Sequence, residues 1–509
     1  MAAEGMDGGP AGGPAGSNGP APSAAPRRQL PEPPRPAAQA IDSLLTVILT
    51  TSPTPSAPST DLVAAVLASF RAHCPALLAC PVIVVFDTYD HIGPQLRLKK
   101  GCVTPVEAAN YDAYKANVKQ LVGRTWGGID DGGQDAADTA IETGLAEYGS
   151  PMIADNAVPF TIMRTAGGRI AFVEPTQRLG FGLAVRTAVR AATTPYVWVQ
   201  QHDWTLAADI PVAAMLDAMQ TAENAIRTAE NAVGDGGGGL AESAGEDPTP
   251  TKELFETSED DRTPGTPGTP GTPSTPGSPA HSVPEEHTSA LDPSRPVAIR
   301  YICLPSVRML RYATSAHAVG FPTLRSLTAA FKRDVPVSSS VLASGSRASR
   351  SGDNAGQSQN LPLTPLFFWH DKTHIAARDH YLRRVFASRL ALGRGDFIED
   401  HIGQRARAQM KRDPAAWHRW ACWLYYPDNG NRLCLRHLQG RTWRGEQQEQ
   451  AIRDAYVLRN RSAASAAAAA AMAAAETKAK QQYGTTDDVT RGADHGWHAM
   501  PFGSDEEAS

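Results

Sequence analysis

Hydroxyl and carboxylate side chains follow three apolar segments that have the composition of buried strands. They are Thr51 and Ser52 after residues 44–50, Asp87 at the end of 81–87, and Asp203 near the end of 196–204. In open α/β sheets, ligands bind beyond the carboxyl ends of the strands. The pattern therefore predicts that these side chains line one small-molecule site.

Three further acids, Asp396, Glu399 and Asp400, stand at the start of a predicted helix over residues 397–411. A carboxylate can act as a general base when it lies within hydrogen-bonding reach of the proton that it removes. Acids also favour a helix N-terminus because of the helix dipole. On the residues alone, catalysis and helix capping both remain open.

Residues 369–381 combine aromatic, acidic and histidine side chains. His370 and His374 have the spacing of a zinc-protease motif, but the required Glu does not follow the first histidine. Aromatic faces beside polar groups suit sugar rings. We therefore predict that Trp369, Asp371 and His374 bind an acceptor molecule.

Basic side chains occur near the end of the predicted second half, at His437 and Arg441. A guanidinium fork, such as that of Arg441, matches the oxygens of a phosphate group. His437 is either a ligand-binding residue or a structural residue at the edge of the core.

The elements that must position these residues alternate between strand and helix. Residues 44–50 and 81–87 flank a helix with apolar residues from Leu62 to Phe70 at helical spacing, which predicts a parallel β-α-β unit. Thr104 and Glu107 form a capping box that opens a second helix. Later elements are predicted at 169–174, 180–192, 196–204 and 211–221.

The second half continues with strands at 297–305 and 365–369 and helices at 376–390 and 397–411. Asn429-Gly430 is typical of a hairpin turn, which predicts that the two flanking apolar segments pair with each other. The fold class expected from this order is α/β.

The segments VILTTSP, VIVVFD and EPTQRLGFGLAVRTAVRAATTPYVWVQQHDW, in this order, resemble the nucleotide-binding half of inverting GT-A glycosyltransferases, the group that includes the family-two enzymes. The resemblance implies a Rossmann-like, mostly parallel mixed sheet flanked by helices. By position it places Thr51 and Ser52 at the nucleoside, Asp87 at the base and Gly180 at a helix start beside the donor. Asp203 would bind the diphosphate and its divalent cation, Mn²⁺ or Mg²⁺.

GDFIEDHIGQ resembles the acidic motif of the same enzymes, in which a carboxylate takes the proton of the acceptor hydroxyl. The resemblance implies that Asp400 is the catalytic base, with Glu399 as the second choice. RHLQGRTW resembles their C-terminal stretch, which implies a metal-binding His437 and a phosphate-binding Arg441. The chain departs from the family at Gln201, where the family usually has an Asp that carries charge to the cation.

Composition divides the chain into five segments. Gly, Ala, Pro and Ser dominate three stretches that lack the large apolar residues needed for a core. The predicted segments are a disordered tail at 1–40, a nucleotide-sugar-binding half at 41–233, a disordered insertion at 234–296, an acceptor-binding and catalytic half at 297–445 with a mobile loop at 337–360, and an Ala-rich helix with a disordered tail at 446–509.

The net charge of -5 and the pI near 6.3 argue against nucleic acid as a partner. No window reaches the ~18–20 apolar residues of a transmembrane helix, and the N-terminus lacks the pattern of a signal peptide, so we expect a cytoplasmic protein. The six cysteines include no C-x-x-C pair, and we expect them to be reduced. No phosphate-binding loop or dinucleotide fingerprint supports a kinase or a dehydrogenase.

The sequence thus predicts a glycosyltransferase that moves a sugar from a nucleotide-diphosphate donor to a hydroxyl acceptor, with inversion. Two alternatives remain. One is an inactive interaction protein with the same fold, whose Thr-Pro repeats bind partners. The other is a sugar-phosphate nucleotidyltransferase, for which the expected Gly/Arg/Lys-rich first loop is missing from the sequence.

Overall fold

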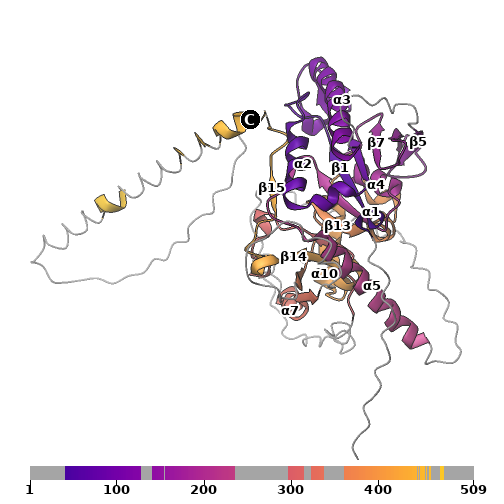
Figure 1. Cartoon of the computed structure of the whole chain (residues 1–509), viewed down its shortest axis with the longest axis vertical. Coiled ribbons are helices and arrows are strands. Elements are labelled where there is room, and N and C mark those ends of the chain that lie inside the picture. Colours follow the sequence, from indigo (N-terminus) through magenta and orange to yellow (C-terminus); the bar gives the residue numbers. More distant parts are fainter. Residues whose placement is uncertain are drawn as a thin grey trace, which may run out of the picture. The chain divides into compact units, whose positions relative to one another are not determined.

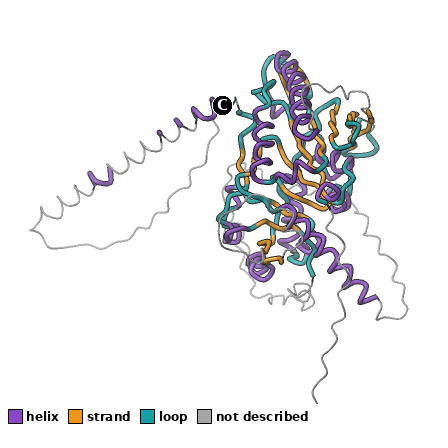
Figure 2. The backbone as a smooth tube through the Cα atoms, viewed as in Figure 1, coloured by secondary structure: helices purple, strands orange, loops and turns teal. Residues whose placement is uncertain are grey.

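The computed structural model describes residues 40–127, 140–153, 155–234, 296–314, 322–336 and 360–443, with short stretches between 445 and 474. Its centre is a mixed sheet of 11 strands flanked by helices (Figure 1; Figure 2). Across the sheet the strands are β11 (Arg333–Pro336), β12 (Asn360–Pro365), β14 (Cys422–Tyr425), β10 (Tyr301–Cys303), β13 (His374–Ala377), β8 (Tyr196–Gln201), β1 (Leu45–Thr51), β2 (Val82–Phe86), β7 (Ile170–Pro175), β6 (Ala157–Arg164) and β5 (Ala140–Glu147). The predicted α/β class is confirmed.

The middle of the sheet consists of the parallel strands β7, β2, β1 and β8. Every residue of β1 and β2 is buried, and Val47 pairs with Val82 in their ladder. Strands covered on both faces need continuous apolar runs, and the segments LTVIL and VIVVF supply them. The predicted β-α-β unit is therefore confirmed.

Helices cover both faces of these strands (Figure 1). They are α2 (Asp61–His73), α3 (Pro105–Gly127), α4 (Phe181–Ala191) and α5 (Val212–Gly234). Right-handed crossovers place α2 and α3 on one face, and they place α4 on the other because the chain crosses back over β1 to reach β8. The hydroxyl Oγ1 of Thr104 accepts the N–H of Glu107 at 3.2 Å, which confirms the predicted cap of α3.

The second half of the chain continues the same sheet, because β13 pairs with β8 in antiparallel register, with Ile375 opposite Trp198. Two small sheets stand apart: β15 (Leu435–His437) with β9 (Trp204–Leu206), and β3 (His91–Ile92) with β4 (Cys102–Val103). The remaining α-helices of the named elements are α1 (Ile41–Leu44), α7 (Pro322–Phe331), α9 (Arg378–His380), α10 (Gln404–Arg412) and α11 (Ala416–Trp420). A π-helical turn, Glu399–Gly403, leads directly into α10.

The hairpin predicted at Asn429-Gly430 is wrong. The strand before it, β14, lies between β10 and β12, and the strand after it, β15, pairs with β9. Asp428, Asn429 and Gly430 all have positive φ, in a turn that redirects the chain. The pairing surfaces of both strands are thus occupied by partners distant in sequence.

Two other predicted boundaries are also wrong. The strand predicted at 365–369 ends at Pro365, since β12 covers 360–365 and the chain then leaves the sheet. The helix predicted at 376–390 loses its first residues to β13, because Ala376 and Ala377 pair with β8. Strands β5 and β6 are not predicted from the sequence.

The predicted disordered segments 1–40 and 234–296 and the predicted mobile loop 337–360 lie almost entirely outside the described residues, as does most of 446–509. All six cysteines are buried and free of disulfides, as expected. In the part of the chain that the structure describes, no helix has the length and apolar character to cross a membrane.

Candidate functional site

A pocket opens where the strand order of the sheet reverses. From β1 the chain proceeds to β2 and β7 on one side and then crosses to β8 on the other. Such a reversal leaves a crevice beyond the carboxyl ends of the strands. This first pocket encloses about 860 Å³, including solvent at its mouth. Its walls include residues 50–54 after β1, 87–89 after β2, 201–203 after β8, the start of α4, and Gly395, Phe397, Gly440 and Arg441.

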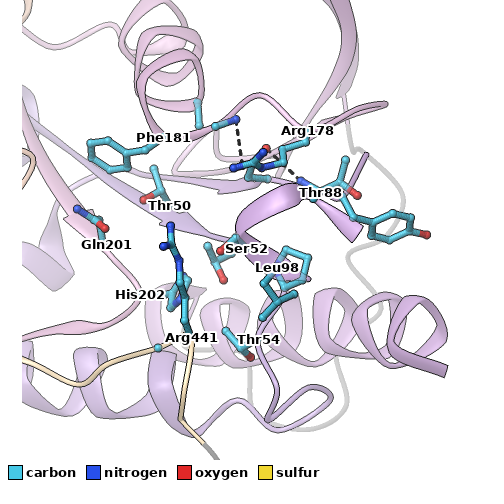
Figure 3. Close-up of a pocket in the computed structure, with 18 of the residues that line it drawn as sticks. Thr50, Ser52, Thr54, Thr88, Leu98, Arg178, Phe181, Gln201, His202 and Arg441 are labelled. Atoms are coloured by element: carbon cyan, nitrogen blue, oxygen red, sulfur yellow. Dashed lines mark hydrogen bonds between the residues drawn. The ribbon is translucent and has the colours of Figure 1, made fainter. Parts of the chain in front are cut away.

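The segment with Gly440 and Arg441 faces the residues at the end of β1 across the first pocket. Figure 3 shows the side chain of Arg441 directed into the space beside Ser52. Ser52 is half-buried, whereas Thr51 is 1% exposed and its hydroxyl is hydrogen-bonded to that of Tyr114 at 2.6 Å. Of the two hydroxyl residues predicted at the nucleoside, Ser52 is the one accessible to a ligand.

Asp87 uses both carboxylate oxygens to hold the loop before α4. Oδ1 accepts the N–H of Leu179 at 2.7 Å, and Oδ2 accepts the N–H of Gly180 at 3.1 Å. Burial raises the pKa of Asp87 to about 6, although these N–H groups and Arg178 partly oppose the rise. Asp87 lines the pocket, and its hydrogen bonds tie the end of β2 to the helix start.

Gly180 permits the closest backbone approach at the site. Its φ of 79° and ψ of 165° lie in a region that essentially only glycine adopts. A Cβ atom here would lie 2.4 Å from Cα of Gly395. The N–H of Gly395 donates to the carbonyl of Leu179 at 2.8 Å. This backbone contact brings the segment with Phe397 to the wall of the first pocket.

Asp203 is fixed by the C-terminal segment. Its Oδ2 lies 3.1 Å from Nε2 of His437 and accepts the N–H of Gly440 at 3.2 Å. Burial by itself would raise the pKa of Asp203, but the hydrogen bond and charge of His437 lower it. Oδ1 is buried and has no hydrogen-bond partner among the described residues. One oxygen of this carboxylate therefore remains for a ligand.

Asp203 could supply one oxygen to a divalent cation that also binds phosphate. Oδ1 of Asp203 is available, His437 is bonded to the other oxygen, and Gln201 carries no charge. The residues described here include no group of three or more His, Cys, Asp or Glu placed to share an ion. Mg²⁺ is commonly held by one or two carboxylates together with substrate phosphates and water. A cation at Asp203 would take its other ligands from a bound diphosphate.

A second pocket adjoins the first, and Gln201 and Phe397 line both. The other residues of its wall are Trp204, Arg308, Asp371, Lys372, Glu399 and Asp400. Asp400 is exposed, whereas Glu399 is half-buried. Asp203 and Asp400 thus line adjoining pockets, although they are far apart in sequence.

Two of the acids in the second pocket, Asp371 and Glu399, are joined by two hydrogen bonds. The N–H of Asp371 donates to Oε2 of Glu399 at 3.3 Å, and the N–H of Glu399 donates to Oδ2 of Asp371 at 3.2 Å. Burial raises the pKa of Asp371 well above its usual range. Burial acts to raise the pKa of Glu399, but His370, with Nδ1 3.4 Å from Oε2, together with Lys372 and the N–H of Asp371, lowers it to about 2. The two carboxyl groups therefore differ strongly in proton affinity.

Trp369 and His374, predicted to bind an acceptor, line neither pocket. Both are fully buried. The two ring nitrogens of His374 lie 2.6 Å from the carbonyl of Lys372 and 2.6 Å from the hydroxyl of Tyr381. The ring of Trp369 packs 4.2 Å from that of Tyr301, centroid to centroid. Of the three predicted acceptor residues, only Asp371 reaches a pocket.

Sequence reasoning missed Phe397, Lys372 and Arg308 in these walls. Phe397 and Lys372 adjoin the acidic motif and the 369–381 stretch, so proximity to these motifs was a usable signal. Arg308 lies in a short 3-10 helix, Val307–Met309, after β10, and no pattern distinguishes it in the sequence.

Comparison of the chain with models of protein families finds no match, and comparison with curated proteins finds none either.

Proposed function

We propose that the protein is a glycosyltransferase that moves a sugar from a nucleotide-diphosphate donor to a hydroxyl acceptor, with inversion at the anomeric carbon. The observation that carries the proposal is the pair of adjoining pockets at the carboxyl ends of the strands. One offers hydroxyl groups, Arg441 and an unpaired oxygen of Asp203, and the other collects three carboxyl groups.

The first pocket suits the donor. Ser52 offers a hydroxyl to the nucleoside, and Arg441 offers its guanidinium fork to the diphosphate. A divalent cation, Mn²⁺ or Mg²⁺, held by Oδ1 of Asp203 would offset the charge that the leaving diphosphate gathers. His437 keeps Asp203 ionised and oriented, since it is bonded to Oδ2.

The second pocket suits the acceptor. Asp400 takes the proton of the acceptor hydroxyl, whose oxygen forms a bond to the anomeric carbon while the bond to the diphosphate oxygen breaks. The electron pair of that bond leaves with the diphosphate. Glu399 is less suited to this task, because its low pKa and its bond to His370 make it a weak base. The base and Arg441 stand in different pockets, which favours attack opposite the leaving group.

Donor binding and transfer test the proposal separately. Calorimetry with a panel of UDP- and GDP-sugars, with and without Mn²⁺, should detect binding of at least one donor by the wild type. Asp203→Asn should weaken that binding by about tenfold, as expected for one charged contact. Asp400→Asn should leave it unchanged and lower kcat for transfer by about 100-fold or more.

The matched control is Asp379→Asn, which alters an exposed acid paired with Arg383 and outside both pockets. It should change neither quantity. If the wild type binds none of these donors, the proposal fails and the interaction protein with the same fold becomes the better reading. A wild-type kcat in Asp400→Asn would overturn the assignment of the base.

A further inference from the structure

Asp371 is held on three sides by neighbouring residues. Its carbonyl oxygen accepts the side-chain N–H of Gln201 at 2.8 Å. Its own N–H donates to Oε2 of Glu399, and its Oδ2 accepts the N–H of Glu399. Backbone and side chain are therefore fixed from two different elements, the end of β8 and the turn that precedes α10.

One polar atom of Asp371 remains unsatisfied. Oδ1 is buried and has no hydrogen-bond partner within the described part of the chain, and the residue as a whole is 6% exposed. A buried carboxylate oxygen without a hydrogen-bond partner is destabilising. Asp371 lines the second pocket, so a ligand bound there can supply the missing partner.

We propose that Asp371 binds the acceptor through Oδ1, at a hydroxyl group other than the reacting one, and that Gln201 and Glu399 are positioning residues for Asp371. The proposal rests on the glycosyl transfer proposed above and specifies its acceptor as a neutral polyol such as a sugar. Burial favours the uncharged carboxyl group, which can both donate to and accept from a hydroxyl. An acceptor with a positively charged ammonium group would instead require the ionised carboxylate of Asp371.

The same arrangement explains the residue at position 201. The amide of Gln201 donates to the carbonyl of Asp371, which an ionised carboxylate at this position could not do because it has no proton to donate. Gln201 lines both pockets. Its hydrogen bond therefore connects strand β8 of the first pocket to the loop of Asp371 in the second.

Steady-state transfer from the donor identified in the binding panel tests the inference, with p-nitrophenyl glycosides of glucose, galactose and mannose as acceptor probes. Asp371→Ala should raise the KM for the best glycoside by about tenfold, and Asp371→Asn, which keeps an oxygen in place, by about threefold. Donor affinity from calorimetry should stay within about twofold of the wild type in both variants. Gln201→Met, which lacks the amide donor, should raise the same KM.

Asp413→Asn is the matched control, because Asp413 also caps a backbone N–H, that of Ala415 at 2.9 Å, and lines neither pocket. An unchanged glycoside KM in both Asp371 variants would overturn the inference and leave the proposed function standing. So would transfer to none of the glycosides by a wild type that binds a donor. A wild type that binds no donor would overturn both proposals together.

Discussion

The two pockets differ in how their walls are assembled. The first takes its floor from residues that directly follow the parallel strands β1, β2 and β8. The second takes its acids from the loop before β13 and the turn before α10, which are joined by the bonds between Asp371 and Glu399 and by the contact of His370 with Glu399. A sheet edge positions side chains through the register of its strands, whereas loops depend on one another.

Each pocket contains acids whose pKa values are shifted in opposite directions. Asp203 has a lowered pKa because of His437, despite its burial. In the second pocket, Asp371 has a raised pKa and Glu399 a lowered one. Environments that separate the pKa values of neighbouring acids are typical of sites that move protons. The first pocket has the same contrast, because burial raises the pKa of Asp87 in its wall to about 6.

The largest expected effect comes from breaking the close backbone contact between Gly180 and Gly395 in the wall of the first pocket. Gly180→Ala forces a Cβ atom to 2.4 Å from Cα of Gly395 and places alanine at a φ of 79°. Neither backbone can move cheaply, so we expect a loss of about 3 kcal/mol or more in the free energy of unfolding. Urea denaturation measures it.

Two other glycines, Gly167 and Gly168, separate the effect of the positive φ from that of the steric clash. Gly168 also has positive φ, but a Cβ there meets nothing within 4 Å, and Gly167 has neither problem. Gly168→Ala should cost about 1 kcal/mol and Gly167→Ala about zero. If all three variants unfold at the same urea concentration, the close approach of Gly180 to Gly395 does not contribute to stability.

A second prediction concerns the hydrogen bonds by which Asp87 connects the end of β2 to the start of α4. Asp87→Ala leaves the N–H groups of Leu179 and Gly180 without their acceptor, which should cost about 2 kcal/mol or more. Asp87→Asn keeps one acceptor and should cost less. Urea denaturation of both variants at neutral pH measures the difference, and equal losses in Asn and Ala would contradict the hydrogen-bonding role.

The pH dependence of the same residue has a defined sign. Folding raises the pKa of Asp87 from 3.8 to about 6, so its stabilising contribution is complete below pH 3.8 and is lost as the pH rises through 6. The free energy of unfolding of Asp87→Asn relative to wild type should therefore improve between pH 4 and pH 7. A flat difference over this range would show that Asp87 ionises as it does in the unfolded chain.

The smallest effect is expected at Glu399, which is partly exposed and therefore screened by solvent. Folding lowers its pKa from 4.5 to about 2, so its contribution is present above pH 4.5 and is lost as the pH falls toward 2. Thermal unfolding of Glu399→Gln should show a lower Tm than wild type at neutral pH, with a gap that narrows in acid. A gap that widens in acid would reverse the assigned sign.

The sequence predicted the first pocket better than the second. Apolar runs locate β1, β2 and β8, and the rule for open sheets then brings Ser52, Asp87 and Asp203 to one edge. In the 369–381 stretch, the same reasoning selected three residues by type, and only Asp371 faces a pocket. Nothing in the residue types shows that His374 satisfies both ring nitrogens inside the core.

The edge strands show a similar limit. Most of β5 is exposed, so its residues lack the apolar pattern that marks β1 and β2. Its existence depends on the ladder with β6, in which Thr143 pairs with Thr161. Likewise Asn429-Gly430 predicts a turn, but the partners of the flanking strands come from distant parts of the chain.

The order of strands and helices, and the polar residues that end the strands, follow from the sequence alone, because burial imposes a local pattern on each parallel strand. Only the tertiary structure decides that Gly180 meets Gly395, that His437 holds Asp203, and that Gln201 reaches Asp371. These contacts join residues far apart in the chain, and their formation depends on packing in three dimensions rather than on any local pattern.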